Sequence, residues 1–277
     1  MILNAGNILL IGSILLFVSI VVGKAGFRFG VPALLLFLGV GMLFGTDGLG
    51  IEFNNPQTAQ FIGVIALSII LFSGGMDTSA AEIKPVLGQG IVLATVGVML
   101  TALLTGYFIY YITNLGNSFI TLNFTESLLL ASVMSSTDSA SVFSILRSKR
   151  QGLKENLRPM LELESGSNDP MAYMLTILLI GIIQSGESSL SNTILQFIMQ
   201  MSIGAVSGYL LGRLAVYCIN KLNINQSLYP VLLLAFVFFI FSFTDLVKGN
   251  GYLAVYLAGL VVGNHKVVHK KSLTTFF

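Results

Sequence analysis

Long apolar runs alternate with short polar stretches along almost the whole chain. Most of these runs approach the roughly 20 residues that a helix needs to cross the ~30 Å hydrocarbon core of a bilayer. Two of the runs are short for this purpose, so we expect tilted or partly re-entrant helices there. The pattern predicts an all-α polytopic membrane protein with nine spans, at residues 8–23, 31–45, 57–76, 86–112, 126–146, 159–183, 193–220, 228–247 and 251–263.

Composition agrees with this pattern. The 277 residues are 55% hydrophobic and 9% charged. A soluble domain has about 25% charged residues, so a soluble protein is excluded. The single cysteine, Cys218, excludes an intrachain disulfide and lies in an apolar run, where we expect it to be a small packing residue. The first run has neither a basic residue before it nor a small-residue cleavage site after it, so we expect a retained helix and not a signal peptide.

The basic residues predict how the spans are oriented. Cytoplasmic loops of membrane proteins carry an excess of lysine and arginine. If the N-terminus lies outside, 13 of the 14 basic residues fall on the inner side and only Lys248 falls outside. This alternation supports all nine spans, including the two short ones, and predicts that the basic loops are cytoplasmic.

The two short runs resemble each other. Residues 34–45 read LLLFLGVGMLFG and residues 252–263 read YLAVYLAGLVVG, and both end in glycines four residues apart. Small residues at this spacing let helices approach closely. The two runs would cross the membrane in opposite directions, as inverted-topology repeats of secondary transporters do. Ordinary glycine packing at Gly41/Gly45 and Gly259/Gly263 is the alternative.

An inverted repeat also predicts the domain organisation. The first repeat would cover residues 1–192, with core helices within 86–183, and residues 193–227 would form a linking helix. The second repeat would start within residues 228–277. Because these residues hold only two of its helices, we expect about four more helices after Phe277.

Two neighbouring runs each carry an aspartate deep inside them, on either side of a short basic loop. Asp138 lies nine residues before Arg147, and Asp169 lies eleven residues after Arg158. At ~1.5 Å per residue, both aspartates lie roughly 14–17 Å from the loop, near the middle of a ~30 Å core. A charge at that depth costs at least ~2.5–3.5 kcal/mol and usually marks a functional site.

Residues 135–139, which read SSTDS, interrupt the fifth run. Short hydroxyl and carboxylate side chains compete for backbone hydrogen bonds, so we expect the helix to unwind here. Unwound backbone is tolerated at membrane depth where it is buried in protein or lines a wet cavity. A polar seam between helices is the alternative, although the charge of Asp138 counts against it. Thr137 would complete a shell of oxygen ligands.

The sixth run contains a second polar cluster. Pro170 lacks an N–H and leaves the carbonyl of Gly166, four residues earlier, free to face a ligand. Ser165, Asn168 and Asp169 share nearly the same helix face. Such hard oxygen ligands suit alkali and alkaline-earth cations, so we predict a cation site at Asp169. A buried, protonated or paired Asp169 that only stabilises packing is the alternative.

Four other polar residues are not assigned to the cation site by these arguments. Glu164 lies about 9 Å from the loop and is expected to need a basic partner, which no lysine or arginine at that depth supplies. Glu162 is shallower and is expected to be solvated at the inner surface. His265 and His269 are four residues apart in a basic tail; we expect a solvated loop, with a metal pair as the alternative.

The paired motifs Thr137-Asp138, Glu164-Ser165 and Asn168-Asp169 resemble the signature of bacterial Nha-type monovalent cation/proton antiporters. The most similar branch is that of the potassium/proton antiporters, also called cell volume regulation proteins. The resemblance runs from the first span to the end of the chain. It implies a homodimer in the bacterial inner membrane, built on a fold of about 13 helices with a dimer-forming domain and a mobile core domain.

The resemblance also implies residue roles. Asp169 would hold the cation and a proton in turn, and Asn168, Ser165 and the backbone of Thr137 would help form the site. Asp138 would offset the dipole of a half-helix. No cofactor is implied, and no metal besides the transported alkali cation.

Two further positions refine this picture. The resemblance implies that Glu164 pairs with an arginine of a later helix, which the chain does not contain. Many sodium/proton members carry a glutamate on the third span, directly before a glycine, whereas this chain has Ser73 there. The serine weakens a sodium assignment and favours potassium.

We therefore expect an antiporter that exchanges a monovalent cation for H⁺. Because position 168 is an asparagine, one titratable group remains there, and the exchange is expected to be electroneutral. Two alternatives stay open. An intramembrane aspartyl protease also uses two mid-membrane aspartates, but its usual glycine-x-glycine-aspartate is absent. A cation channel without coupling to protons is the other. A zinc enzyme is disfavoured, because neither histidine lies at membrane depth.

Overall fold

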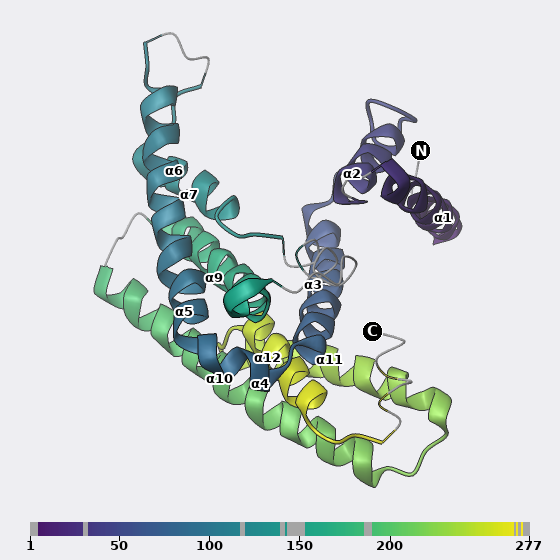
Figure 1. The fold of residues 1–277 in the computed structure, drawn as a ribbon. Coiled ribbons are helices and arrows are strands. Elements are labelled where there is room, and N and C mark those ends of the chain that lie inside the picture. The colour runs from purple at the N-terminus through teal and green to yellow at the C-terminus, as the bar shows by residue number, and fades with distance from the viewer. Residues whose placement is uncertain are drawn as a thin grey trace. The chain divides into compact units, whose positions relative to one another are not determined.

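The computed structural model describes residues 5–29, 33–116, 120–138, 142, 153–185, 190–268, 270 and 273. Every regular element in these ranges is helical (Figure 1). The chain divides into two compact units, Met1–Ile62 and Gly63–Phe277, which are described separately.

The first unit consists of α1 (Ala5–Phe29), α2 (Ala33–Phe44) and the beginning of α3 (Pro56–Asp77). Helices α1 and α2 pack against each other. At ~1.5 Å per residue, the 12 residues of α2 span only about 18 Å. This confirms that the second apolar run is short for a membrane span.

The second unit holds the rest of α3 and the remaining helices. A continuous helical stretch from Ala80 to Thr113 follows α3. It changes geometry twice, because Pro85 begins a 3₁₀ turn and a π-helical turn follows at Leu93–Gly97. Its parts are α4 (Ala80–Ile83), η1 (Lys84–Val86), α5 (Leu87–Val92), η2 (Leu93–Gly97) and α6 (Val98–Thr113).

Five further α-helices of this unit lie within the described residues. Helix α7 begins at a capping box in which Asn123 and Glu126 bond each other's backbone N–H at 2.8–2.9 Å. The 3₁₀ turns η3 (Lys154–Asn156) and η4 (Gln226–Leu228) precede α9 and α11. The helices are α7 (Phe124–Val133), α9 (Leu157–Ser185), α10 (Leu190–Lys221), α11 (Tyr229–Leu246) and α12 (Gly251–Asn264).

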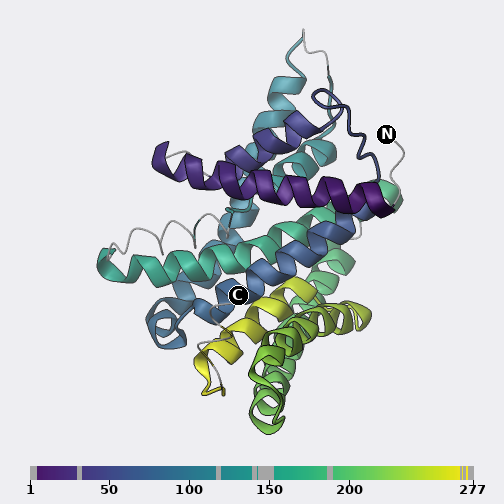
Figure 2. The ribbon, with the colours of Figure 1, turned by 90° about the vertical axis from the view of Figure 1, so that its right-hand side faces the viewer.

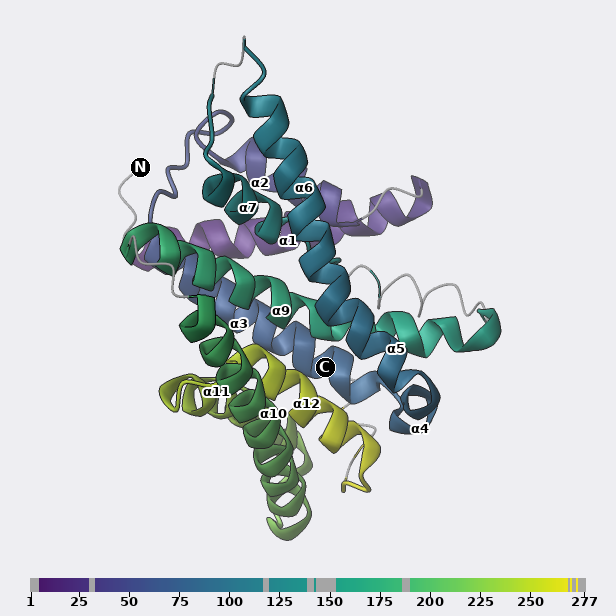
Figure 3. The ribbon, with the colours of Figure 1, turned by 90° about the vertical axis from the view of Figure 1, so that its left-hand side faces the viewer.

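Helix α12 is the most buried helix of this unit, and glycines on both of its sides explain why. A Cβ atom added to Gly259 or Gly263 would lie 2.3 or 1.9 Å from the backbone oxygens of Phe72 or Met76 on α3. On α10, Gly204, Gly208 and Gly212 contact α12 in the same way. Figures 2 and 3 show α12 next to both helices. Without side chains in the way, the backbones approach closely and bury α12.

This packing confirms the close approach predicted for Gly259 and Gly263. The corresponding expectation for the second run is wrong for the described chain, because Gly41 has no atom within 4 Å of where its Cβ would stand, and Gly45 meets only oxygens of its own helix. Whether the two runs belong to an inverted repeat, with the predicted boundaries, stays a prediction.

All nine predicted runs overlap helices in the part of the chain that the structure describes. Five helices are long and apolar enough to cross a membrane, and four shorter apolar helices accompany them. The five are Pro56–Asp77, Ala80–Thr113, Lys154–Gln184, Ile194–Lys221 and Gln226–Leu246. The shorter four are Leu9–Lys24, Leu35–Phe44, Phe124–Val133 and Gly251–Asn264.

Candidate functional site: an unwound segment against helix α9

The fifth apolar run unwinds where the sequence predicts it. Helix α7 ends at Val133, and residues 134–138 are not helical. Hydroxyl side chains contribute to this end, since Ser135 Oγ donates to the carbonyl oxygen of Ser132 at 2.7 Å. Such a bond competes with helical hydrogen bonding. Residue 139, the last of the predicted polar stretch, lies outside the described residues.

The unwound segment contacts α9 at its central polar cluster. The Ser136 hydroxyl lies 3.0 Å from Asn168 Oδ1 and also hydrogen-bonds to the carboxylate of Asp169. A hydroxyl has one proton, so Ser136 donates to one of these two oxygens at a time. Sequence reasoning assigned no role to Ser136, although it belongs to the polar stretch that predicted the unwinding.

Thr137 joins the same cluster through its side chain. Its Oγ1 accepts a 2.6 Å hydrogen bond from Asn168 Nδ2 and lies 2.9 Å from Ser165 Oγ. The resemblance implied a role for the backbone of Thr137, so its side-chain contacts are an addition. Thr137, Ser165, Asn168 and Asp169, which sequence analysis selected, therefore lie together.

Glu164 also belongs to this cluster. Asn168 Nδ2 donates to Glu164 Oε1 at 2.8 Å, and the hydroxyls of Thr137 and Ser165 lie 3.5 and 3.4 Å from Oε2. The expected basic partner of Glu164 stays a prediction. Asp138 is exposed, as is Thr137 beside it, and the backbone carbonyl of Asp138 accepts from Val142 N at 3.0 Å.

Burial differs among the α9 residues of this cluster. Ser165 is 0% exposed and Asn168 is 1% exposed, whereas Asp169 and Glu164 are half-buried. Among the described residues, no group of three or more histidine, cysteine or acidic side chains could hold a metal ion. The cluster offers hydroxyl, amide and carboxylate oxygens, which are ligands for hard cations.

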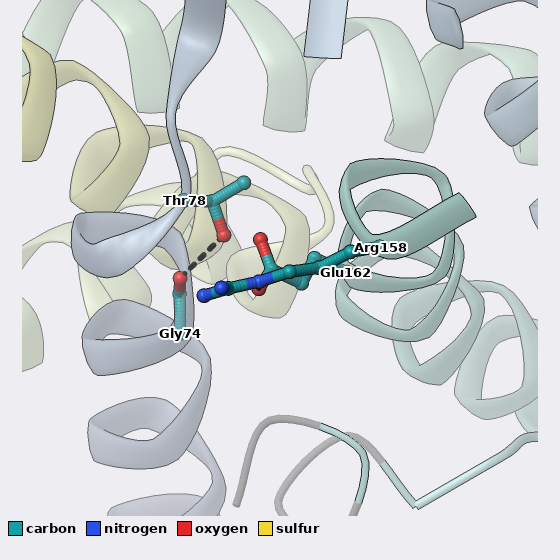
Figure 4. A network of polar contacts seen from close by, with 4 residues as sticks. All are labelled: Gly74, Thr78, Arg158 and Glu162. Atoms are coloured by element: carbon teal, nitrogen blue, oxygen red, sulfur yellow. Dashed lines mark hydrogen bonds and ion pairs between the residues drawn. The ribbon is translucent and has the colours of Figure 1, made fainter. Parts of the chain in front are cut away.

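The solvation predicted for Glu162 is wrong. It was expected to be solvated, but it is only 7% exposed and forms a 3.0 Å ion pair with Arg158 one helical turn earlier. Figure 4 shows both side chains facing the end of α3, where Thr78 Oγ1 donates to the carbonyl oxygen of Gly74 at 2.7 Å. The beginning of α9 packs beside α3, and this contact removes Glu162 from solvent.

His265 lies in a partly exposed loop, as expected, and makes two polar contacts there. Its Nδ1 lies 2.7 Å from the carbonyl oxygen of Val261, and its Nε2 lies 2.6 Å from Arg213 Nη1 on α10. Because the carbonyl can only accept and the guanidinium can only donate, Nδ1 is the donor and Nε2 the acceptor in this geometry. His269 lies outside the described residues, so the alternative of a metal pair is not tested.

The chain is similar to a family of known proteins over most of its length. Residues 12–277 match the model of a family described as "Sodium/hydrogen exchanger, transmembrane". The chain is 42% identical over 262 residues to the K(+)/H(+) antiporter NhaP of Alkalimonas amylolytica, and 37% identical over 264 residues to the K(+)/H(+) antiporter NhaP2 of Shewanella sp. (strain ANA-3). Each alignment covers 94% of this chain and 44% of the relative. The chain thus spans less than half the length of these curated relatives.

A solved structure shares the fold. The sodium proton antiporter MjNhaP1 from Methanocaldococcus jannaschii superposes with a TM-score of 0.79 at 22% sequence identity. The superposition covers 95% of this chain and 64% of the solved one. At this level of identity the likeness shows the fold alone.

Proposed function

The chain belongs to the sodium/hydrogen exchanger family of transmembrane proteins, and from this premise we propose that the protein exchanges a monovalent cation for H⁺ across the membrane. The family is one of integral, multi-pass transporters, so the protease and zinc-enzyme interpretations are set aside. K⁺ is the favoured cation, because two relatives at 37–42% identity are named K(+)/H(+) antiporters. Ser73, in the place of the glutamate of many sodium/proton members, supports the same choice.

A single observation carries the proposal. The unwound segment brings the Ser136 and Thr137 side chains onto Asp169 and Asn168 of α9. This gives one carboxylate a set of neighbouring oxygen atoms at a place where regular helical hydrogen bonding is interrupted. Broken helices of this kind form the substrate and ion sites of many secondary transporters.

The proposed mechanism is a competition at Asp169. As a carboxylate, Asp169 binds the cation together with nearby hydroxyl and amide oxygens, which replace part of its water shell. When Asp169 takes up a proton, its charge is lost and the cation leaves. Asn168 carries no titratable proton, so each cycle exchanges one cation for one proton and moves no net charge.

Asp169→Asn tests the proposal. An amide can neither take up a proton nor supply the charge that holds a cation, so K⁺-driven proton movement should fall at least ~100-fold, to the level of empty vesicles. The measurement uses full-length protein in proteoliposomes with a pH-sensitive dye inside. Asp245→Asn, the same substitution at an exposed position near the end of α11, is the matched control and should keep wild-type exchange.

Other outcomes would reject parts of the proposal. Appreciable exchange by the Asp169→Asn protein would remove Asp169 from its central role. Cation flux that does not depend on a proton gradient would favour the channel alternative. A membrane potential generated by K⁺/H⁺ exchange would contradict the one-for-one count.

The proposal also covers the membrane location, orientation and oligomeric state of the protein. A homodimer in the bacterial inner membrane, with the N-terminus outside, is supported by the family resemblance and by the distribution of basic residues. The dimer is tested by the molar mass of the purified full-length protein in detergent.

A further inference from the structure

Helix α12 contacts the proposed site from a second side of α9. Ser165, Asn168 and Asp169 contact the unwound segment, whereas the next face of α9 carries Gly166 and Pro170, which are one helical turn apart. A Cβ atom on Gly166 would lie 2.3 Å from the Tyr256 ring of α12. The α9 stretch that holds Asp169 is therefore enclosed between the unwound segment and α12.

Asn250 connects α12 to this stretch by hydrogen bonds. Its side-chain Nδ2 donates to the carbonyl oxygen of Pro170 at 3.1 Å, directly after Asp169 in the chain. Its Oδ1 accepts from Leu253 N at 3.0 Å and so caps the beginning of α12. Its backbone N donates to Gln200 O of α10 at 2.9 Å. Asn250 is 4% exposed and bonds three helices at once.

The contact lies where α9 is least able to hold its own geometry. Pro170 lacks an N–H, so the helix loses the hydrogen bond that would fix the Gly166 carbonyl. Asn250 donates to the carbonyl of Pro170 itself, one turn after Gly166, and so attaches the end of this weakened turn to α12 from outside the helix. A shift of the turn would move Asp169 away from Ser136 and Asn168 away from Thr137.

We infer that Asn250 is a positioning residue, which holds the Asp169 turn of α9 in register with the unwound segment. The inference rests on the proposed function, because Asn250 itself donates to a backbone carbonyl and not to the carboxylate. It predicts that loss of the Asn250 amide weakens cation binding without removing the group that binds.

Asn250→Ser is the first test variant. Serine caps helices about as well as asparagine, but its shorter side chain cannot cap α12 and reach the Pro170 carbonyl at the same time. The apparent KM for K⁺ in proteoliposomes of the full-length protein should rise about 3–10-fold, the equivalent of one lost hydrogen bond. We expect kcat to change less than about twofold, since Asp169 and its titration are kept.

Asn250→Asp provides a second variant of nearly identical shape. It keeps the capping oxygen, but it places a carboxylate oxygen against the Pro170 carbonyl in place of the donor. Two acceptors repel each other, so the KM for K⁺ should rise more than with serine. This variant decides the question if the serine protein does not accumulate in the membrane.

Asn264 offers a matched control at the opposite end of α12. Its Nδ2 donates to Thr78 O, and its Oδ1 accepts from Ala80 N, both at 2.8 Å. Asn264→Ser thus removes contacts between α12 and a neighbouring stretch, but far along the helix from Asp169. It should lower thermal stability to a similar degree and leave the KM for K⁺ within about twofold of wild type.

The outcomes separate the inference from the proposed function. If the Asn250 variants and Asn264→Ser have the same KM for K⁺, while Asp169→Asn abolishes exchange, the positioning role is rejected and the proposed function stands. If Asp169→Asn keeps exchange, the proposed function itself fails. An increase in KM confined to the Asn250 variants supports the positioning role.

Discussion

At the scale of single residues, Asn168 organises the candidate site. Its Nδ2 donates to Thr137 Oγ1 at 2.6 Å and to Glu164 Oε1 at 2.8 Å, and its Oδ1 accepts from Ser136. It is 1% exposed. One buried amide thus holds two hydroxyls of the unwound segment and a carboxylate of α9. Only a side chain with both a donor and an acceptor end can make these contacts.

Asn168→Asp tests this role. The sequence alone suggests that a second aspartate would add a titratable group and a second proton to each cycle. The structure predicts a different result, because an aspartate cannot donate to Glu164 and would face its carboxylate. A buried donor lost without replacement costs about 1–3 kcal/mol, so exchange should fall roughly 5–100-fold and stay electroneutral.

The measurement is the initial rate of K⁺/H⁺ exchange in proteoliposomes, with a potential-sensitive dye in parallel. Ser167→Ala, at a neighbouring half-buried position of α9, serves as the control for general effects of substitution on this helix. Wild-type rates accompanied by a membrane potential in Asn168→Asp would show that the amide only limits the proton count.

At the scale of helices, glycines determine which helices meet. Gly259 and Gly263 let α12 approach the backbone of α3, and Gly204, Gly208 and Gly212 let α10 approach α12. The α10 contact lies at the beginning of α12, where Asn250 reaches α9, and the α3 contact lies near its end. The helix packing is therefore part of the support of the candidate site.

Gly263→Ala and Gly41→Ala make a matched pair of substitutions. Both glycines lie near the end of a short apolar helix with the same glycine spacing. A Cβ atom added to Gly263 would lie 1.9 Å from the Met76 carbonyl oxygen, whereas nothing in the described chain lies within 4 Å of the corresponding atom at Gly41. We expect Gly263→Ala to lower the free energy of unfolding by about 1–3 kcal/mol, and Gly41→Ala to leave it unchanged or slightly higher.

Thermal unfolding of the purified protein in detergent, followed by intrinsic tyrosine fluorescence or by circular dichroism, provides the comparison. Equal melting temperatures for Gly263→Ala and wild type would mean that α12 and α3 are not in close contact in the membrane protein. A marked loss in Gly41→Ala would instead reveal a partner for α2 beyond the described contacts.

At the scale of the whole molecule, the orientation of the spans decides which side of the membrane each loop faces. The basic residues predict that the N-terminus lies outside and that the loop before α9 is cytoplasmic.

Cysteine labelling tests this orientation in intact cells. Cys218→Ser removes the cysteine of these 277 residues, and Glu52→Cys and Lys154→Cys then place thiols at exposed positions on the predicted outer and inner sides. A membrane-impermeant maleimide should label Glu52→Cys in intact cells, and Lys154→Cys only after permeabilisation. The reverse pattern would invert the predicted orientation.

The sequence by itself determined the helices and the point where one of them breaks. Apolar runs predict helices because a bilayer offers the backbone no other hydrogen-bond partners. The SSTDS stretch predicts unwinding because its side chains compete with helical hydrogen bonds, and Pro170 predicts a free Gly166 carbonyl because it lacks an N–H. For the same local reasons, Thr137, Ser165, Asn168 and Asp169 could be selected from the sequence.

The tertiary structure decided which atoms meet. Ser136 was not selected, because only the path of the unwound chain brings its hydroxyl to Asp169. Glu162 is buried because α9 begins beside α3, and Asn250 reaches the Pro170 carbonyl across 80 residues of sequence. Gly41 and Gly263 have the same local spacing but different surroundings. Local sequence sets backbone preference, whereas contacts between distant residues depend on how whole helices pack, which no short pattern encodes.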